Sequence, residues 1–369
     1  MSTYVYQHYD WPHFMWDNDM VLMYLADVRF AQGKLMGKLE TLGFEMRENA
    51  QFEMLSLEVL KSAEIEGELY KPEEVRSSVA KKLGLDKFQN VQAGKHVDGV
   101  VEMVYDALTN FHEPLTKERL FAWHAALFPT GYSGMYQITV GQYRVDSTGP
   151  MQVVSGALGK ERVHFQAPHS DLLPTEMEAF LEWFNEDQGL DLVLKAGVAH
   201  FWFLTLHPFE DGNGRIARAL TDLLLARSDK STQQFYSLSA QLLKERKAYY
   251  ELLEKCQKGD MDLTNWLLWF LNCFHVAVKS TNEILNHTLQ KAAFWKTHSQ
   301  TLLNDRQLKV VNRLLDAFEG NLTSTKWAKM CKCSQDTALR DLNDLLRKSV
   351  LKKNDSGGRS THYSLVLTD

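Results

Sequence analysis

The sequence predicts a mainly α-helical protein that contains one small β-hairpin and ends in a separate small unit. Apolar residues recur at helical spacing through most of the 369 residues. Short β-leaning pieces are confined to the stretch between Gly141 and Pro168. The charge also shifts along the chain: residues 321–369 carry nine Lys or Arg and five Asp or Glu, a net +4, which leaves −10 on the other 320 residues. This asymmetry marks the C-terminal stretch as a separate unit.

The main part of the chain is expected to be a bundle of helices. The spacing of apolar residues predicts helices at 19–48, 51–66, 97–130, 174–186, 190–206, 213–228, 240–258 and 261–290. The segment 190–206 is apolar nearly all round, which is typical of a central helix buried on every side. The pieces Gln152–Val154 and Arg162–Phe165 flank a glycine-containing loop and predict the hairpin.

The C-terminal unit has the element order of a winged helix-turn-helix. Helices are predicted at 305–319 and 323–331, and a third begins after Ser334, a plausible N-cap. Val350–Leu351, a basic turn and a closing strand at His362–Val366 would form the wing. Basic side chains that could contact DNA phosphates are Lys329, Lys332, Arg340, Lys352, Lys353 and Arg359. Docking of a protein by the same unit stays equally open.

Composition is that of an ordinary globular protein, with 44% hydrophobic and 24% charged residues. No stretch of eighteen residues lacks charge, so we expect no transmembrane helix and no membrane partner. The N-terminus lacks a basic region followed by an apolar one, which argues against secretion. Four cysteines, with no pair at zinc spacing, fit a reducing compartment, and we expect a cytoplasmic protein.

The segment HPFEDGNGRIAR, His207–Arg218, has features of a phosphate site. Gly212 and Gly214 remove side chains where the backbone must approach a ligand. The helix that follows presents its positive N-terminal end at the same place. Arg215 and Arg218 lie one helical turn apart and can meet further phosphate oxygens.

Two other residues of the segment add chemistry to this site. Asp211 supplies a hard oxygen ligand of the kind that Mg²⁺ takes alongside substrate phosphates. His207, fixed by Pro208, is the group in the segment that can take up a proton near neutral pH. A loop rich in Gly, Asn and Asp between helices is usually a simple turn. The high density of Gly, His, Asp and Arg in this segment, directly after a buried helix, favours a phosphate-binding site over a simple turn. The sequence contains no P-loop and no HExxH.

The segment resembles the signature of the Fic family, HxFx(D/E)GNGRxxR, at every specified position. Gly141-Gln142-Tyr143-Arg144 resembles the stretch before the Fic flap hairpin, Met151–Gly156 the flap, and Lys247-Ala248-Tyr249-Tyr250 the adenine pocket. The N-terminal region resembles the helical extension of a bacterial Fic subgroup whose members also end in a winged helix. The resemblance therefore implies an N-terminal helical region at 1–95, a Fic core at 96–290 and a winged helix at 300–369.

The resemblance also implies a role for each residue of the site. His207 would be the general base, and Asp211 would hold Mg²⁺ on the ATP phosphates. The phosphates and adenine would be bound by Gly212, Asn213, Gly214, Arg215, Arg218, Tyr249 and Tyr250. The flap residues Val153, Val154, Ser155 and Gly156 would pair with a target segment as an added strand. The implied activity is transfer of AMP from ATP to a Ser, Thr or Tyr hydroxyl of a target protein or of the chain itself, with a homodimer as the expected assembly.

A second motif lies on the helix predicted at 51–66. Ser62, Glu66 and Gly67 match the Fic inhibitory pattern (S/T)xxxE(G/N). By that resemblance Glu66 would pair with Arg218 and deny it to the γ-phosphate of ATP. Glu64 and Glu68, on either side of Glu66, are expected to be ordinary solvated residues.

Other functions remain open from the residues alone. The protein could be a DNA-binding regulator whose Fic core senses nucleotide. It could also be a Fic enzyme that removes AMP from a modified target or transfers another phosphate-linked group. The intact motif with Arg218 favours ATP.

Overall fold

A computed structural model describes residues 4–85, 91–147, 149–156, 160–187, 189–315, 318, 320–354 and 361–366. The chain divides into two compact units, residues 1–281 (unit 1) and 282–369 (unit 2). The N-terminal region predicted at 1–95 therefore lies in the same compact unit as most of the predicted core. Unit 2 begins earlier than the predicted residue 300.

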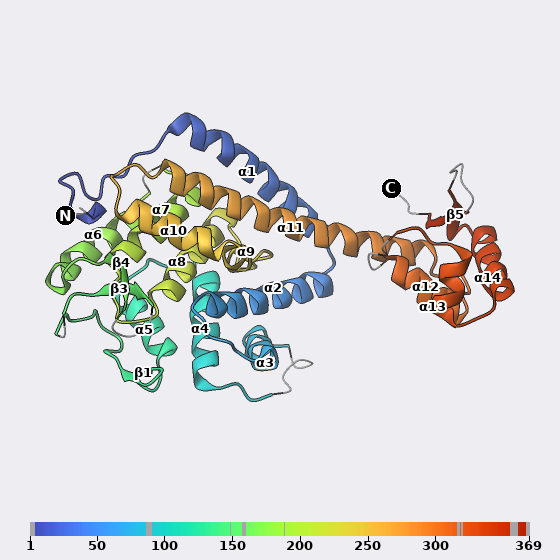
Figure 1. Cartoon of the computed structure of the whole chain (residues 1–369), viewed down its shortest axis with the longest axis horizontal. Helices are drawn as coiled ribbons and strands as arrows, with labels where there is room; N and C mark the ends of the chain where they lie inside the picture. Colours follow the sequence, from blue (N-terminus) through green and yellow to red (C-terminus); the bar gives the residue numbers. More distant parts are fainter. Residues whose placement is uncertain are drawn as a thin grey trace. The chain divides into compact units, whose positions relative to one another are not determined.

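Unit 1 is built mainly from helices (Figure 1). They are α1 (Asn18–Glu40), α2 (Phe44–Ile65), α3 (Pro72–Leu83), α4 (Lys95–Thr109), α5 (Lys117–Leu127), α6 (Leu173–Asn185), α7 (Leu192–Leu206), α8 (Asn213–Asp229), α9 (Leu238–Lys244) and α10 (Arg246–Gln257). Helix α11 (Thr264–Thr297) begins in unit 1, and its last residues belong to unit 2. The strands are short: β1 (Tyr132–Ser133), β2 (Tyr136–Gln137), β3 (Gln152–Ser155) and β4 (Arg162–Gln166). The predicted mainly helical fold is confirmed.

Helix α7 forms the centre of unit 1, as the sequence predicted. Every residue from Val193 to Leu206 is buried. The helix lies against α8, which follows it after the short segment that begins at His207 (Figure 1). Burial on all sides is possible because the helix satisfies its own backbone hydrogen bonds and carries almost no polar side chains. The end of α7 therefore holds the candidate site on a rigid support.

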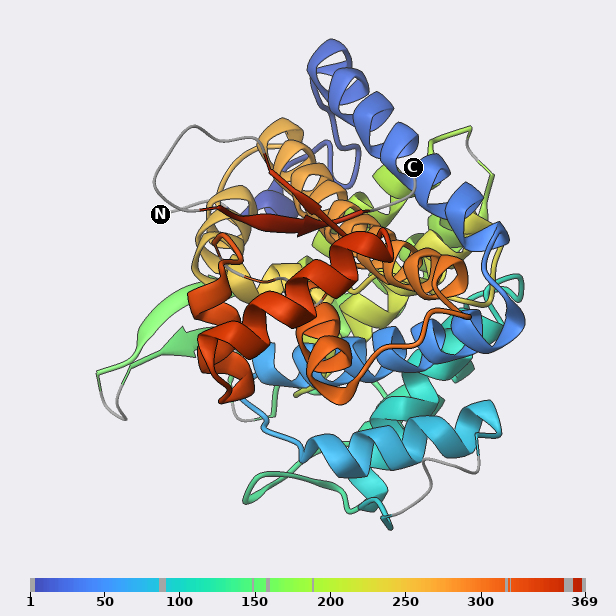
Figure 2. The ribbon, with the colours of Figure 1, turned by 90° about the vertical axis from the view of Figure 1, so that its right-hand side faces the viewer.

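The β3–β4 hairpin is antiparallel, and Figure 2 shows it projecting from the helices of unit 1. Its register pairs Val153 with Phe165 and then shifts, so that Val154 pairs with Val163. Phe165 is buried and anchors the hairpin on the helices, whereas Val154 is exposed. The hairpin thus has one anchored strand and one exposed strand.

Two predicted helices are each divided in the structure. The range 97–130 contains α4 and α5, because Pro114 lies between them and a proline restricts the residue before it and lacks an N–H donor. The range 240–258 contains α9 and α10, which meet at Glu245. The first predicted helix, 19–48, ends at Glu40, and α2 starts seven residues earlier than expected, at Phe44.

Unit 2 contains α12 (Asp305–Leu315), α13 (Ser324–Cys331), α14 (Gln335–Arg347), β5 (Leu351–Lys353) and β6 (Tyr363–Leu365). Buried apolar side chains from the three helices and β5 form its core, among them Val310, Trp327, Leu342 and Leu351. Ser334 caps α14 by accepting a hydrogen bond from the Thr337 amide at 3.2 Å. The order of elements is the one predicted for a winged helix. Arg359, one of the basic residues predicted to contact DNA phosphates, lies outside the described residues.

In the described part of the chain, none of the helices combines the length and apolar character needed to cross a membrane.

Candidate active site

The segment after α7 is held in shape by its own side chains. His207 ends α7 in a left-handed conformation, with φ of 49°. The Asn213 side chain closes the turn twice, since its Oδ1 accepts from the Phe209 amide at 3.0 Å and its Nδ2 donates to the Phe209 carbonyl at 2.8 Å. Helix α8 then begins, and its first amides have no intrahelical acceptor. The start of α8 therefore offers backbone donors of the kind that a phosphate site requires, while the Gly212 amide before it donates to Asp211 Oδ1 at 2.5 Å.

Two residues from other parts of unit 1 brace this segment. Arg144 donates from Nε to the His207 carbonyl at 2.8 Å, and its own amide donates to the Pro208 carbonyl at 2.9 Å. His124 stacks on Phe209, with ring centroids 4.2 Å apart, and its Nε2 lies 3.2 Å from the Asp211 carbonyl. Burial lowers the pKa of His124 to about 4, so the ring is neutral at pH 7. Both residues are positioning residues for the segment.

A cavity of about 520 Å³ opens beside the start of α8. Its lining brings together His207 and Gly214 from the segment, Val153, Val154 and Ser155 from the flap, Tyr249 and Tyr250 from α10, and Glu66 from the end of α2. These residues are separated by up to 184 positions in the sequence, and the fold places them around one space. Gly156 follows β3 with φ of 111° and is not part of the lining.

The electrostatics of His207 suit a proton acceptor. Its Nδ1 lies 3.3 Å from the Leu204 carbonyl, so a proton on Nδ1 leaves Nε2 as the acceptor. Burial lowers the pKa of His207 to about 4, with Arg144 acting in the same direction. The imidazole is therefore neutral near pH 7 and can take up a proton.

The aromatic part of the cavity comes from α10. The Tyr249 ring is buried, stacks on Trp269 at 5.7 Å, and its hydroxyl lies 2.8 Å from His200 Nε2. Tyr250 lies under the Arg246 guanidinium at 5.3 Å. Both rings are fixed by these contacts, so this side of the cavity can receive a flat aromatic base.

Arg218 is held by three hydrogen bonds to residues at the C-terminal end of α2. Its NH1 is 2.8 Å from Glu66 Oε1, its Nε donates to Ser62 Oγ at 2.8 Å, and its NH2 donates to the Ser62 carbonyl at 2.8 Å. The Arg218 side chain is 3% exposed and that of Glu66 is 30% exposed. A Cβ at position 214 would overlap the Glu66 carboxylate, so glycine is required there while Glu66 is in place. The structure brings the two predicted partners together.

The expectation for Glu68 was wrong. Its Oε2 lies 2.9 Å from Arg215 NH1 and also accepts from the Tyr70 hydroxyl at 2.5 Å. Arg215 is 2% exposed and lies over the Phe128 ring at 5.0 Å. The side chain of Glu68 is 38% exposed, but it is engaged with a buried arginine of the motif and not with solvent alone. Glu64, in contrast, pairs with Lys61 on the surface, as expected of a solvated residue.

Asp211 is the candidate metal ligand. Its Oδ2 accepts from Ser133 Oγ at 2.5 Å, and its side chain is 42% exposed. Within the described residues, no three His, Cys, Asp or Glu side chains are grouped so that they could hold a metal ion by themselves. Oδ1 of Asp211 also accepts from the Gly212 amide at 2.5 Å, and Oδ2 lies 3.9 Å from Arg215 NH2. An exposed carboxylate of this kind fits Mg²⁺, which proteins bind with one or two carboxylates plus substrate phosphates.

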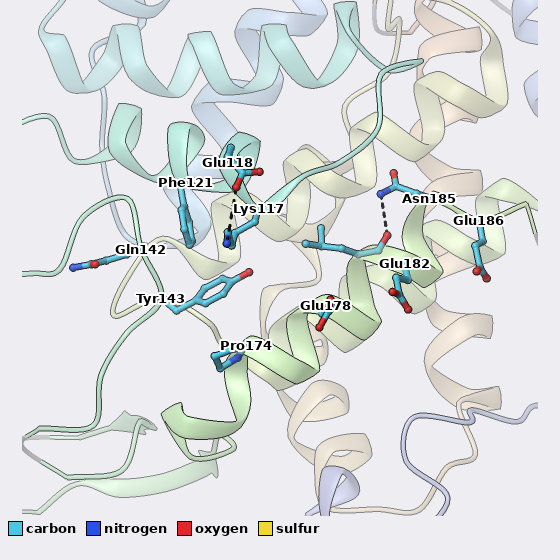
Figure 3. A pocket seen from close by; sticks show the side chains of 11 residues that line it. Lys117, Glu118, Phe121, Gln142, Tyr143, Pro174, Glu178, Glu182, Asn185 and Glu186 are labelled. Atoms are coloured by element: carbon cyan, nitrogen blue, oxygen red, sulfur yellow. Dashed lines mark hydrogen bonds and ion pairs between the residues drawn. The ribbon is translucent and has the colours of Figure 1, made fainter.

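A larger cavity, of about 1140 Å³, lies elsewhere in unit 1. Figure 3 shows Glu178 and Glu182 of α6 on one side of it, with Lys117 and Tyr143 on the other. Carboxylates along its wall repel phosphates, and none of the motif residues from His207 to Arg218 is in its lining. The cavity next to His207 is therefore the better candidate for a nucleotide.

Comparison with known proteins agrees with this geometry. Residues 114–225 match the model of the Fic/DOC family, and residues 4–85 match a domain of unknown function, DUF4172. A probable protein adenylyltransferase of Aquifex aeolicus is 26% identical over 95 residues, which cover 26% of this chain and 27% of that protein. A protein adenylyltransferase Fic of Drosophila mojavensis is 34% identical over 87 residues, which cover 23% of this chain and 16% of that protein. The matches thus span less than a third of either relative.

The fold comparison covers much more of the chain. A solved Fic family protein from Desulfovibrio desulfuricans G20 is similar with a TM-score of 0.54 at 18% identity, over 95% of this chain and 97% of that chain. Residues 114–225 therefore form a Fic/DOC family domain. In this domain the signature lies between α7 and α8, where the contacts above hold it.

The sequence alone did not reveal the roles of three residues at this site. His124 lies on α5 within an apolar helical pattern, and no local signal distinguishes it from a core histidine. Arg144 belongs to the Gly141–Arg144 stretch named in the sequence analysis, but its hydrogen bond to the His207 carbonyl depends on the tertiary fold and is not indicated by the sequence. Glu68 lies two residues after Glu66, and the inhibitory pattern ends before it.

Proposed function

We propose that this Fic protein transfers AMP from ATP to a hydroxyl side chain of a target protein. The observation that carries the proposal is the shared cavity. The neutral imidazole of His207, the N-terminal end of α8 at Gly214 and the exposed strand β3 all border it. A base, a phosphate-binding helix end and a strand that can hold a peptide are the parts that such a transfer needs.

The reaction is an in-line displacement at the α-phosphorus of ATP. The oxygen of the target hydroxyl forms a bond to the α-phosphorus while the bond to the bridging α–β oxygen breaks, and pyrophosphate leaves with that oxygen. His207 Nε2 takes the hydroxyl proton. A positioned base contributes about 10²- to 10⁴-fold, and positioning and charge neutralisation supply most of the rest.

The start of α8 would hold the phosphates. The amides of Gly212, Asn213 and Gly214 bind oxygens, with Arg215 and Arg218 meeting the outer phosphates. When bound, Mg²⁺ neutralises phosphate charge, with Asp211 as its carboxylate ligand. Tyr249 and Tyr250 border the cavity on the side where the adenine would lie.

The flap would position the target. Strand β3 pairs with β4 in a two-stranded sheet, which leaves the other edge of β3 available. A target segment added at this edge from Val153 to Ser155 is held by main-chain hydrogen bonds, which places its hydroxyl near His207 without requiring one particular sequence.

In the resting chain the proposed activity is low. Glu66 and Ser62 take up Arg218, so the γ-phosphate loses its partner and ATP cannot adopt the productive pose. The proposal is therefore tested with the Glu66→Gly protein.

The test compares two radiolabels on ATP. The Glu66→Gly protein is incubated with Mg²⁺ and either α-³²P-ATP or γ-³²P-ATP, alone and with cell lysate, and intact mass is measured in parallel. We expect label from the α-phosphate only, with a mass gain of one AMP on the protein itself or on a target. The matched control is Glu66→Gly with His207→Ala, which should bind ATP and transfer nothing. Transfer of γ-label, or full transfer by the control, would refute AMP transfer with His207 as base.

A further inference from the structure

The turn that follows α2 carries two carboxylates that face the start of α8. Helix α2 ends at Ile65, and Gly67 adopts φ of 84°, a left-handed conformation that glycine takes without strain. The amides of Gly67 and Glu68 donate back to the carbonyls of Glu64 and Ala63, at 3.0 and 3.1 Å. The turn is thus fixed by its backbone, and it directs both Glu66 and Glu68 to α8.

Each carboxylate takes a different arginine of the signature. Glu66 Oε1 is 2.8 Å from Arg218 NH1, and Glu68 Oε2 is 2.9 Å from Arg215 NH1. The two arginines are three residues apart and so lie on the same face of α8. Both arginines are almost fully buried, whereas the side chains of the two glutamates are 30% and 38% exposed. The glutamates are therefore the partners that can withdraw.

From this geometry we infer that Glu68 is a second brake, which occupies Arg215 while Glu66 occupies Arg218. The inference rests on the proposed function of the site as one that binds a nucleotide polyphosphate. Arg215 is one of the two cations of the signature that would meet phosphate oxygens. A carboxylate on its guanidinium both competes with those oxygens and cancels the charge that attracts them.

The surroundings of Arg215 support this assignment. Its Nε is buried without a hydrogen-bond partner in the described structure, so Glu68 leaves part of the guanidinium unsatisfied. Arg215 also lines a cavity of about 420 Å³ together with Lys95 and His96, and Glu68 is the one carboxylate among the residues that line it. Withdrawal of Glu68 would leave a space bordered by basic groups, which favours an anion.

Tyr70 positions the second brake. Its hydroxyl donates to the same Oε2 that meets Arg215, at 2.5 Å, and its ring lies 5.6 Å from His96. Loss of this hydroxyl leaves Glu68 with fewer contacts but keeps its charge. Tyr70→Phe should therefore release the brake partly, and Glu68→Gln more fully.

The two brakes should not act independently of each other. Removing Glu68 alone leaves Arg218 occupied, so nucleotide still binds unproductively and transfer stays low. Removing Glu66 alone frees Arg218 but leaves Arg215 held. We expect Glu68→Gln to raise kcat/KM about 3- to 10-fold in the Glu66→Gly protein and to change it less than 2-fold in the natural chain, the size of one partly exposed charged contact.

The experiment measures nucleotide binding by calorimetry, which does not depend on transfer. Adenosine, ADP and ATP are titrated with Mg²⁺ into Glu66→Gly and into Glu66→Gly with Glu68→Gln. We expect ADP and ATP to bind about 3- to 10-fold more tightly to the double variant, with adenosine unchanged. Glu66→Gly with Glu64→Gln is the matched control, because Glu64 lies two residues before Glu66 and forms its ion pair with the surface residue Lys61 rather than with an arginine of the signature.

The outcomes separate the second brake from the proposed activity. If binding of ADP and ATP is unchanged, or if adenosine gains equally, Glu68 is not a brake even where AMP transfer is observed. If binding changes as expected while no AMP is transferred, the brake stands and the proposed reaction is wrong. Should Glu68→Gln fold poorly by thermal unfolding, Tyr70→Phe in the Glu66→Gly protein takes its place, with an expected gain of about 2- to 3-fold; no gain there would overturn the inference.

Discussion

Replacing Glu66 by glycine removes the carboxylate from Arg218 and leaves the guanidinium on its two contacts with Ser62. The perturbation is local, because Glu66 lies at the C-cap of α2 rather than inside the helix. It also opens space at the start of α8, since the Glu66 carboxylate lies where a side chain at Gly214 would be. Glu66→Gly should therefore make Arg218 available to the γ-phosphate and also enlarge the space for the phosphates at the start of α8.

The magnitude follows from the burial of the pair. A hydrogen bond to a charged group contributes about 1.5–3 kcal/mol, and the 30% exposure of the Glu66 side chain keeps this one below the top of that range. If the same energy opposes productive binding of ATP, its loss raises transfer about 10- to 100-fold, or about 1.4–2.7 kcal/mol. The free energy of unfolding should fall by about 1–2 kcal/mol at the same time, because Arg218 stays buried with fewer partners.

The assay measures auto-modification by intact mass, and stability by urea unfolding without nucleotide. Activity should rise as stability falls, and this opposite movement distinguishes a brake from general damage. Arg218→Ala in the Glu66→Gly background should be inactive, since the γ-phosphate then has no partner. Unchanged auto-modification by Glu66→Gly, with a normal thermal transition, would refute the reasoning.

Three further predictions test the site, the anchor of α2 and the boundary between the units. Desolvation lowers the pKa of His207 to about 4, so kcat/KM of the Glu66→Gly protein should stay level from pH 8 to about 5 and fall only as the imidazole gains a proton below that. A loss of activity with a midpoint at about pH 6.5 or above would contradict a base with a lowered pKa. Glu58 of α2 is 1% exposed and accepts hydrogen bonds from Ser237 Oγ at 2.7 Å and from the Ser239 amide at 3.1 Å, which anchors α2 on α9. Glu58→Ala should therefore lower the free energy of unfolding by about 2–4 kcal/mol, whereas the surface control Glu53→Ala should lower it by less than about 1 kcal/mol. Equal losses for the two variants in urea unfolding would exclude Glu58 as an anchor of α2. A chain ending at residue 281, the end of unit 1, should unfold cooperatively, and a non-cooperative transition would contradict this boundary. A chain ending at residue 299 retains Phe294, a core residue of unit 2, without the residues that cover it. This longer chain should therefore associate at high concentration, as measured by light scattering.

The residues of the signature were predictable because their chemistry is contiguous. Glycines, a histidine and arginines within twelve positions after a buried helix indicate one loop and one helix start, whatever surrounds them. The apolar character of 190–206 was likewise sufficient to predict a central helix, and every residue from Val193 to Leu206 is buried. Features of this kind can be predicted from the local sequence pattern alone.

Other features depend on contacts between distant segments, which pattern does not contain. Glu68 is 147 positions from Arg215, and its orientation comes from the left-handed Gly67 between two glutamates that look alike in sequence. His124 is one apolar-face histidine among many until Phe209 is found stacked on it. The break between α4 and α5 was missed for a different reason, since apolar spacing continues across Pro114 although the backbone cannot.

The burial of the two arginines links the brakes to the stability of the fold. A buried guanidinium without an anion beside it is costly, so negative partners for Arg215 and Arg218 stabilise the folded chain. In the resting structure Glu66 and Glu68 supply such partners from a single turn of backbone, and Asp211 Oδ2 lies 3.9 Å from Arg215 NH2. In the proposed active state the phosphates of ATP take the place of the two glutamates. In the proposed mechanism, inhibition and stability therefore depend on the same contacts, because nucleotide phosphates and the two glutamates bind the same guanidinium groups.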